Sequence, residues 1–245
     1  MKLTKMIAGV VFCAAFAGAA FAQQTVKSQK SAGTESTVEK EYLSNVEDVI
    51  ITELATSPEY DNKLVALQYL EEAVNEGRTS PDIVAALQGL AGEGVTKQER
   101  TGRRVMNNFP DIRAKACDLL GEVPSEEAKS TLMVIAQDDK EPMVVSAAVR
   151  SLGNIGLNNG NEVVNMIAFI QKKYAALNPT SSLALEILVA YEKLAATVTE
   201  PADRSTMIES VTEIASNYHF VTPVRTKALQ LLKALQGKST GKKSK

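Results

Sequence analysis

Four basic residues stand close together near the middle of the chain, in a stretch that lacks the apolar periodicity of its surroundings. They are Lys97, Arg100, Arg103 and Arg104, within residues 92–109. Long insertions into compact repetitive proteins are often binding loops, so this stretch is the first candidate for a partner-binding site. The alternative is a solvated excursion that binds nothing.

The conformation of the insertion has two interpretations. Thr96 and Glu99 have the spacing of a capping box, which would begin a helix. The pair Thr101-Gly102 would instead form the turn of a small β-hairpin. We favour the hairpin or an irregular loop.

The residue types and their spacing give little support to metal binding or nucleophilic catalysis. The one histidine, His219, and Cys117 lie far apart in the sequence, and no His/Cys ligand spacing occurs. We expect Cys117 to be a small buried hydrophobe and His219 to interact with the last carbonyls of a helix. Acidic residues are plentiful but no pair stands out. We therefore expect no catalytic residue, no metal and no cofactor.

The N-terminus has the pattern of a secretory signal peptide over residues 1–22. Lys2 and Lys5 precede an apolar run, and Ala20-Phe21-Ala22 precedes Gln23, which places the expected cleavage between Ala22 and Gln23. Residues 23–40 are polar and lack periodicity, as in a flexible leader. The mature chain is expected outside the cytoplasm, in a bacterial periplasm.

The charge distribution argues against a nucleic-acid partner. The formal net charge of the 245 residues is −2, and loss of Lys2 and Lys5 makes it −4. The last nine residues, 237–245, are expected to be a basic disordered tail, so the remaining body is still more acidic. Weak contact with an anionic envelope surface would fall to the lysines of this tail: Lys238, Lys242, Lys243 and Lys245.

The body of the chain, residues 41–236, has apolar residues at helical spacing throughout. All eight prolines fall just before such a pattern, where a missing N–H costs little. Together with starts at Ser36 and Asn161, they predict ten helices that pair into five hairpins. The clearest helix, residues 142–156, is expected to be half-buried, with Ser146, Arg150 and Asn154 on its polar side.

An internal repeat supports this segmentation. The second helix of each hairpin carries an alanine followed four residues later by a leucine, at an irregular spacing that suits helical-pair solenoids. A small alanine lets helices approach closely while leucine fills the gap, so the hairpins should stack. The five pairs are Ala66/Leu70, Ala116/Leu120, Ala148/Leu152, Ala184/Leu188 and Ala228/Leu232.

Two residues after each reference alanine, polar side chains should line one edge of the stack. There Arg150 falls between Asp118 and Glu186, with Gln68 and Gln230 at the outer positions. One interpretation is a ladder of surface ion pairs between repeats. The other is a polar rim to a concave groove that binds a partner; Asn154, one helical turn beyond Arg150, would share this face.

The best-matching segments, residues 142–156 and 111–121, resemble HEAT repeats of the armadillo-like superfamily, including the shorter repeats of phycobilisome lyases. The resemblance implies an all-α, right-handed α-solenoid of about five HEAT-like hairpins. Arg113 and Arg225 match the second-helix arginine of the family, but Val145 and Ser181 occupy that place elsewhere, so an interrupted arginine ladder is expected.

These observations predict an exported, non-enzymatic scaffold or adaptor that binds another protein through the concave second-helix face, helped by the basic insertion. The alternatives are an enzyme or enzyme subunit of lyase type, by the same resemblance, and a structural component of the cell envelope.

Overall fold

The computed structural model describes residues 38–198 and 201–237. The expected signal peptide, residues 23–37 of the expected leader, and residues 238–245 of the expected tail lie outside the described residues. Within them, the first helix already contains residues 38–40, so the helical array begins three residues before the expected boundary at position 41.

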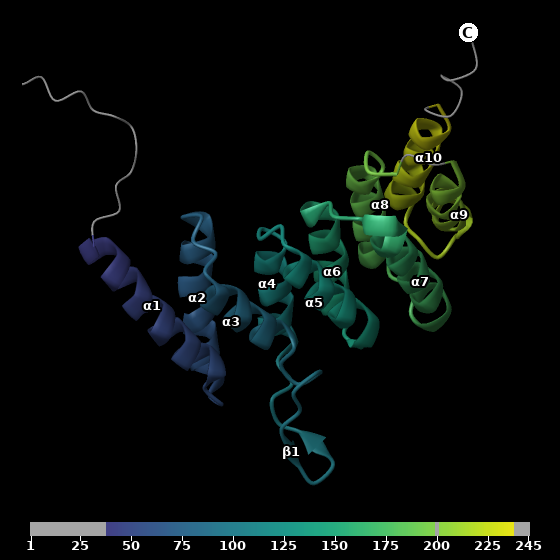
Figure 1. Ribbon diagram of the computed structural model, residues 1–245. Coiled ribbons are helices and arrows are strands. Elements are labelled where there is room, and N and C mark those ends of the chain that lie inside the picture. Colours follow the sequence, from purple (N-terminus) through teal and green to yellow (C-terminus); the bar gives the residue numbers. More distant parts are fainter. Residues whose placement is uncertain (1–37, 199–200, 238–245) are drawn as a thin grey trace, which may run out of the picture. The chain divides into compact units, whose positions relative to one another are not determined.

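Helices dominate the described residues, with one small hairpin of strands (Figure 1). The helices are α1 (Val38–Thr56), α2 (Tyr60–Asn75), α3 (Pro81–Ala91), α4 (Pro110–Leu120), α5 (Glu126–Asp138), α6 (Pro142–Ile155), α7 (Glu162–Leu177), α8 (Ser181–Leu194), α9 (Pro201–Ser216) and α10 (Thr222–Gly237). The strands are β1 (Arg100–Thr101) and β2 (Arg104–Val105), and a short 3-10 turn, η1 (Asn159–Asn161), precedes α7.

Proline and capping chemistry set the helix starts as expected. Helices α3, α4, α6 and α9 begin on a proline, and the remaining prolines lie within two residues of a helix start. Ser80 and Ser125 cap α3 and α5 by accepting hydrogen bonds from the N–H groups of Ile83 and Ala128. Gly156 ends α6 in the left-handed conformation, with φ of 71°.

Consecutive helices pair into five hairpins, and the hairpins stack in chain order. The first helices, α1, α3, α5, α7 and α9, contact one another in sequence, and the second helices, α2, α4, α6, α8 and α10, do the same. The described part of the chain is therefore an all-α solenoid of helical hairpins, as predicted.

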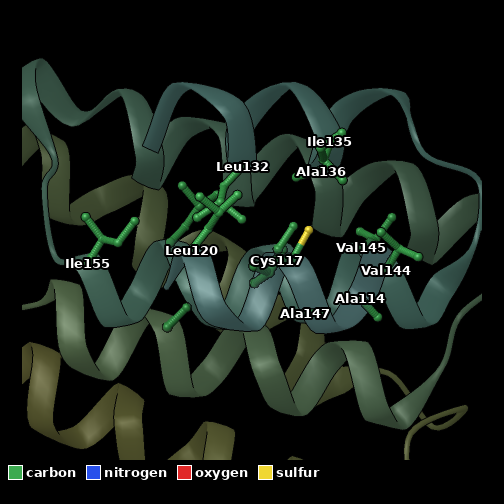
Figure 2. Close-up of a cluster of buried hydrophobic side chains, with 14 of the residues drawn as sticks. Ala114, Cys117, Leu120, Leu132, Ile135, Ala136, Val144, Val145, Ala147 and Ile155 are labelled. Atoms are coloured by element: carbon green, nitrogen blue, oxygen red, sulfur yellow. The ribbon is translucent and has the colours of Figure 1, made fainter. Parts of the chain in front are cut away.

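The core is continuous from hairpin to hairpin. Figure 2 shows one section of it, in which Cys117 and Leu120 of α4, Leu132 and Ile135 of α5, and Val144 of α6 are all buried. The buried apolar side chains of all five hairpins belong to one cluster, so each hairpin depends on its neighbours for stability.

The repeated alanine and leucine positions form the seam between the second helices. Every one of these side chains is buried except Leu232, which is partly buried because α10 is the last described helix. Gly153 of α6 lies so close to α8 that an added Cβ would be 2.7 Å from the Cα of Ala190. The close approach of α6 and α8 thus depends on Gly153 and Ala190, which are small residues outside the predicted alanine and leucine pairs.

The expectation that α6 is half-buried is wrong. Ser146 of the polar side is buried, and so are Ser151 and Gly153 beside the neighbouring helices. This leaves Met143 and Asn154 exposed, and Pro142 and Arg150 partly exposed. The physical reason is its position: α6 contacts α5 within its hairpin and both α4 and α8 beside it, so three neighbours cover it.

Candidate functional site

The insertion between α3 and α4 contains an antiparallel β-hairpin. Arg100 pairs with Val105 and Thr101 with Arg104, so the turn consists of Gly102 and Arg103. Gly102 has a φ of 65°, which glycine adopts without strain. The hairpin prediction is confirmed, with the turn one residue later than the expected Thr101-Gly102.

The alternative of a helix begun by a capping box is wrong. The Thr96 hydroxyl donates to the carbonyl of Gly92 at 3.1 Å instead of capping a helix. The N–H of Glu99 donates to Asn107 Oδ1 at 2.9 Å, across the insertion. The insertion is closed by contacts between its two ends, which a helix would separate.

A buried polar cluster holds the base of the hairpin against the first repeat. The ammonium group of Lys63, a residue only 2% exposed, donates to the carbonyl of Ala55 and to Glu93 Oε2, both at 3.1 Å. The Asn107 amide donates to Glu93 Oε1 and to the carbonyl of Lys97, both at 2.8 Å. These contacts stabilise one position of the hairpin on the scaffold.

Arg113 provides a second anchor from the beginning of α4. Its guanidinium forms a buried ion pair with Asp139, with Nε 2.7 Å from Oδ2. The same side chain donates to the carbonyl of Glu93 and to Asn108 Oδ1, at 3.2 and 2.9 Å. Both ends of the insertion are therefore bound to one buried arginine.

An aromatic pair lies where the insertion enters α4. The rings of Tyr60 and Phe109 are 5.2 Å apart between centroids, and the Tyr60 hydroxyl donates to the carboxylate of Asp111. This hydrogen bond, with the nearby negative charge, raises the pKa of Tyr60 above its ordinary value. The contact links α2 to the beginning of α4.

The basic residues of the hairpin differ from the polar residues at its base, because they are exposed and form no ion pairs with the described residues. Lys97, Arg100, Arg103 and Arg104 are all exposed, and no acidic side chain among the described residues forms an ion pair with any of them. Arg100 donates only to the neutral Gln98, at 2.9 Å. In Figure 1 the hairpin projects away from the helices. Arg100, Arg103 and Arg104 thus lie together on the protruding hairpin, whereas Lys97 precedes it and lies at its base.

The predicted acid and base residues of the second helices form an ion-pair ladder. The guanidinium of Arg150 of α6 lies with Nη2 2.7 Å from Asp118 Oδ1 of α4 and with Nη1 2.8 Å from Glu186 Oε1 of α8. All three side chains are partly exposed. Asn154 accepts a hydrogen bond from Lys193 of α8. Ion pairs also link Glu71 of α2 with Lys115 of α4, and Glu192 of α8 with Lys227 of α10.

The charges of the ladder residues are therefore paired with one another, as in the interpretation of surface ion pairs between repeats. The basic residues of the hairpin have no such partners among the described residues. Among the described residues, no ion pair or hydrogen bond joins the basic residues of the hairpin to this ladder. Partner binding by either group stays a prediction.

Sequence reasoning missed the partners of the recurring basic residues. Lys63 with Glu93 and Arg113 with Asp139 occupy equivalent places, since each joins a second helix to the loop inside the next hairpin. The signal was a basic residue three positions before the reference alanine in three of the five copies: Lys63, Arg113 and Arg225. The row of second-helix basic residues is interrupted, as expected. Its last member, Arg225, lies over the ring of Tyr218, 5.1 Å from the ring centroid, and no described carboxylate pairs with it.

Cys117 is buried as predicted, and burial raises the pKa of its thiol far above the ordinary value. His219 lies exposed in the turn before α10, and among the described residues its ring makes no hydrogen bond with the helix carbonyls. In that part of the chain, no three His, Cys, Asp or Glu side chains are grouped to hold a metal ion. None of the helices described is long and apolar enough to span a bilayer.

Comparison with protein families bears on the stacked hairpins. Residues 103–167, from the tip of the basic hairpin into α7, match the family model of HEAT repeats. The match covers the segments in which the repeat pattern is strongest, and this part of the chain consists of HEAT repeats. No curated protein and no solved structure matches the chain. The finer likeness to phycobilisome lyases stays a prediction.

Proposed function

We propose that this chain is an exported, non-enzymatic scaffold that binds a partner protein, and that the basic hairpin recognises an acidic segment of that partner. One observation carries the proposal: the base of the hairpin is fixed by buried polar contacts, whereas Arg103 and Arg104 at its tip are exposed and pair with no acidic side chain of the described residues. Guanidinium groups held in this way suit carboxylates, with which they form paired hydrogen bonds.

The family supports the general role. HEAT repeats are helical scaffolds that commonly mediate protein interactions, and this chain carries them over residues 103–167. The partner and its class are proposals from the residues of this chain alone.

The second-helix face is a secondary contact in this proposal. Asp118, Arg150 and Glu186 already pair with one another, so a partner must compete with existing ion pairs to use them. We expect this face to orient the bound segment, with Asn154 nearby, and to contribute less affinity than the hairpin.

Crosslinking and pull-down from the native cell envelope test the proposal. The mature chain should capture a defined protein, and the double variant Arg103→Glu/Arg104→Glu should lose it. A matched pair of single variants controls for net charge: Arg103→Glu in the hairpin and Lys233→Glu on the exposed side of α10. The proposal fails if the hairpin variants retain every captured protein, or if Lys233→Glu loses it equally.

Export rests on the pattern of residues 1–22 and is tested separately. Intact-mass measurement of the protein from the periplasm of its native bacterium should give a chain that begins at Gln23. Recovery of the protein only from the cytoplasm, with residues 1–22 retained, would contradict export while leaving the scaffold role unaffected.

A further inference from the structure

The first helix, α1, is apolar on two opposite sides. One side packs on α2 and α3 and buries Ile51 and Ala55. On the opposite side, Tyr42, Val46 and Val49 recur at helical spacing and remain 67%, 40% and 64% exposed. An apolar stripe on a helix is normally buried against another element, so the outer side of α1 lacks a partner among the described residues.

The second helix of the same hairpin shows what kind of partner is missing. The residue three positions after each reference alanine faces the preceding hairpin: Ser151 of α6 lies directly against Gly121 of α4. In the later hairpins this position is buried, as in Leu119 and Ile187. In α2 it is Tyr69, which is 46% exposed. The first hairpin therefore leaves open the face that every later hairpin buries.

Such an open face is unusual for the end of a repeat array. Terminal repeats ordinarily carry a polar outer face, because the apolar surface between repeats would otherwise contact water. Here Tyr42, Val46, Val49 and Tyr69 occupy it. The surface is thus shaped to receive another helix, in the way each hairpin receives its predecessor.

Charge selects among the helices that could dock. Every exposed charged side chain described on α1 and α2 is acidic, and the one described lysine, Lys63, is buried. Glu47 and Glu71 pair with Arg78 and Lys115 of other elements. The remaining three, Glu53, Asp61 and Glu72, form no ion pair with any described residue.

We propose that this end face, formed by α1 and α2, binds a basic amphipathic helix of a partner protein. Its apolar side would cover Val46 and Val49, and its lysines or arginines would meet Glu53 and Glu72. A second copy of this chain fits poorly, because it would bring two acidic rims together. Residues 23–37 of the chain also fit poorly, because Val26 and Ala32 are their only aliphatic residues and form no helical stripe. The surface is independent of the basic hairpin.

A model peptide tests this directly. The probe is a labelled helical peptide with leucines at helical spacing and lysines elsewhere, titrated into the full mature chain by fluorescence anisotropy. Its dissociation constant should rise about tenfold in Val46→Gln/Val49→Gln and in Glu53→Lys/Glu72→Lys. The matched control Phe169→Gln, at an exposed apolar position on α7, should leave it within about twofold.

Several results would overturn the proposal. One is equal binding of a peptide with the same composition in scrambled order, or of a peptide with glutamate in place of lysine. Another is a dimer of the free protein that Val46→Gln/Val49→Gln dissociates, which would assign the face to a second copy. A third is protection of Val49→Cys from maleimide in the full monomeric chain, which would show that the chain's own residues cover the face.

Discussion

Arg113 and Asp139 form a buried ion pair that joins the second hairpin to the third, with Arg113 Nε 2.7 Å from Asp139 Oδ2 and both side chains at most 2% exposed. Arg113 also holds both ends of the basic insertion. A single guanidinium therefore links the stacking of two repeats to the position of the candidate binding element.

Removing one charge of this pair should be costly. In Asp139→Asn the guanidinium of Arg113 stays buried without a counter-charge, and we expect a loss of about 3–5 kcal/mol in the free energy of unfolding. The neighbouring Asp138→Asn changes an exposed carboxylate and should cost less than about 0.5 kcal/mol. Urea denaturation of the two variants measures the difference, and equal stabilities would contradict the prediction.

Two glycine-to-alanine substitutions should act in opposite directions. Gly153→Ala places a methyl group 2.9 Å from the Cβ of Ala190 on α8, and we expect a loss of about 1–3 kcal/mol. Gly89→Ala, in α3, meets no atom within 4 Å and should stabilise the protein by up to about 1 kcal/mol. Thermal unfolding midpoints should therefore move down and up, respectively, and a rise in both would show that the α6–α8 contact is looser than described.

Loss of the anchoring contacts should loosen the hairpin without unfolding the array. In Asn107→Ala, Glu93 Oε1 and the Lys97 carbonyl lose the amide donor, and trypsin should cleave after Arg103 or Arg104 about 5- to 30-fold faster. Glu99→Ala removes an exposed side chain from the same insertion and serves as the control. An unchanged cleavage rate in Asn107→Ala, measured by mass spectrometry, would show that the cluster does not hold the hairpin.

Stability should fall in alkaline solution. Burial raises the pKa of Cys117 and of Tyr191 above their ordinary values of 9.0 and 10.0. Both groups keep their protons in the folded state, whereas the unfolded chain releases them at ordinary values. Their contribution to the free energy of unfolding is therefore complete below about pH 9. Above that pH it decreases by about 1.4 kcal/mol per pH unit for each group that titrates in the unfolded chain.

Urea denaturation across this pH range measures the decrease. Cys117→Ala removes the thiol, so its stability should fall less steeply between about pH 9 and pH 10 than that of the parent protein. Identical slopes for the two proteins would show that the thiol titrates alike in both states.

The sequence predicted some of the candidate binding residues and missed others. Arg150 lies between Asp118 and Glu186 because positions one repeat apart on neighbouring helices meet side by side, which an alignment of the repeats anticipates. The clustering of the hairpin arginines needed only their closeness in the chain. The exposed side of α1 was not foreseen, because its apolar residues looked like an ordinary core stripe.

The sequence by itself determined the elements and their pairing. Helix starts, helix ends and the alanine–leucine seam depend on residues within one or two turns of one another, so local spacing encodes them. Only the tertiary structure decided which groups meet across the fold. Lys63 and Glu93 are 30 residues apart, and Arg113 and Asp139 are 26 apart, so these contacts depend on how the hairpins stack and on the path of the insertion. The same stacking buries α6 on nearly every side and leaves α1 open, because burial depends on the number of neighbours a helix has, which its own residues do not specify.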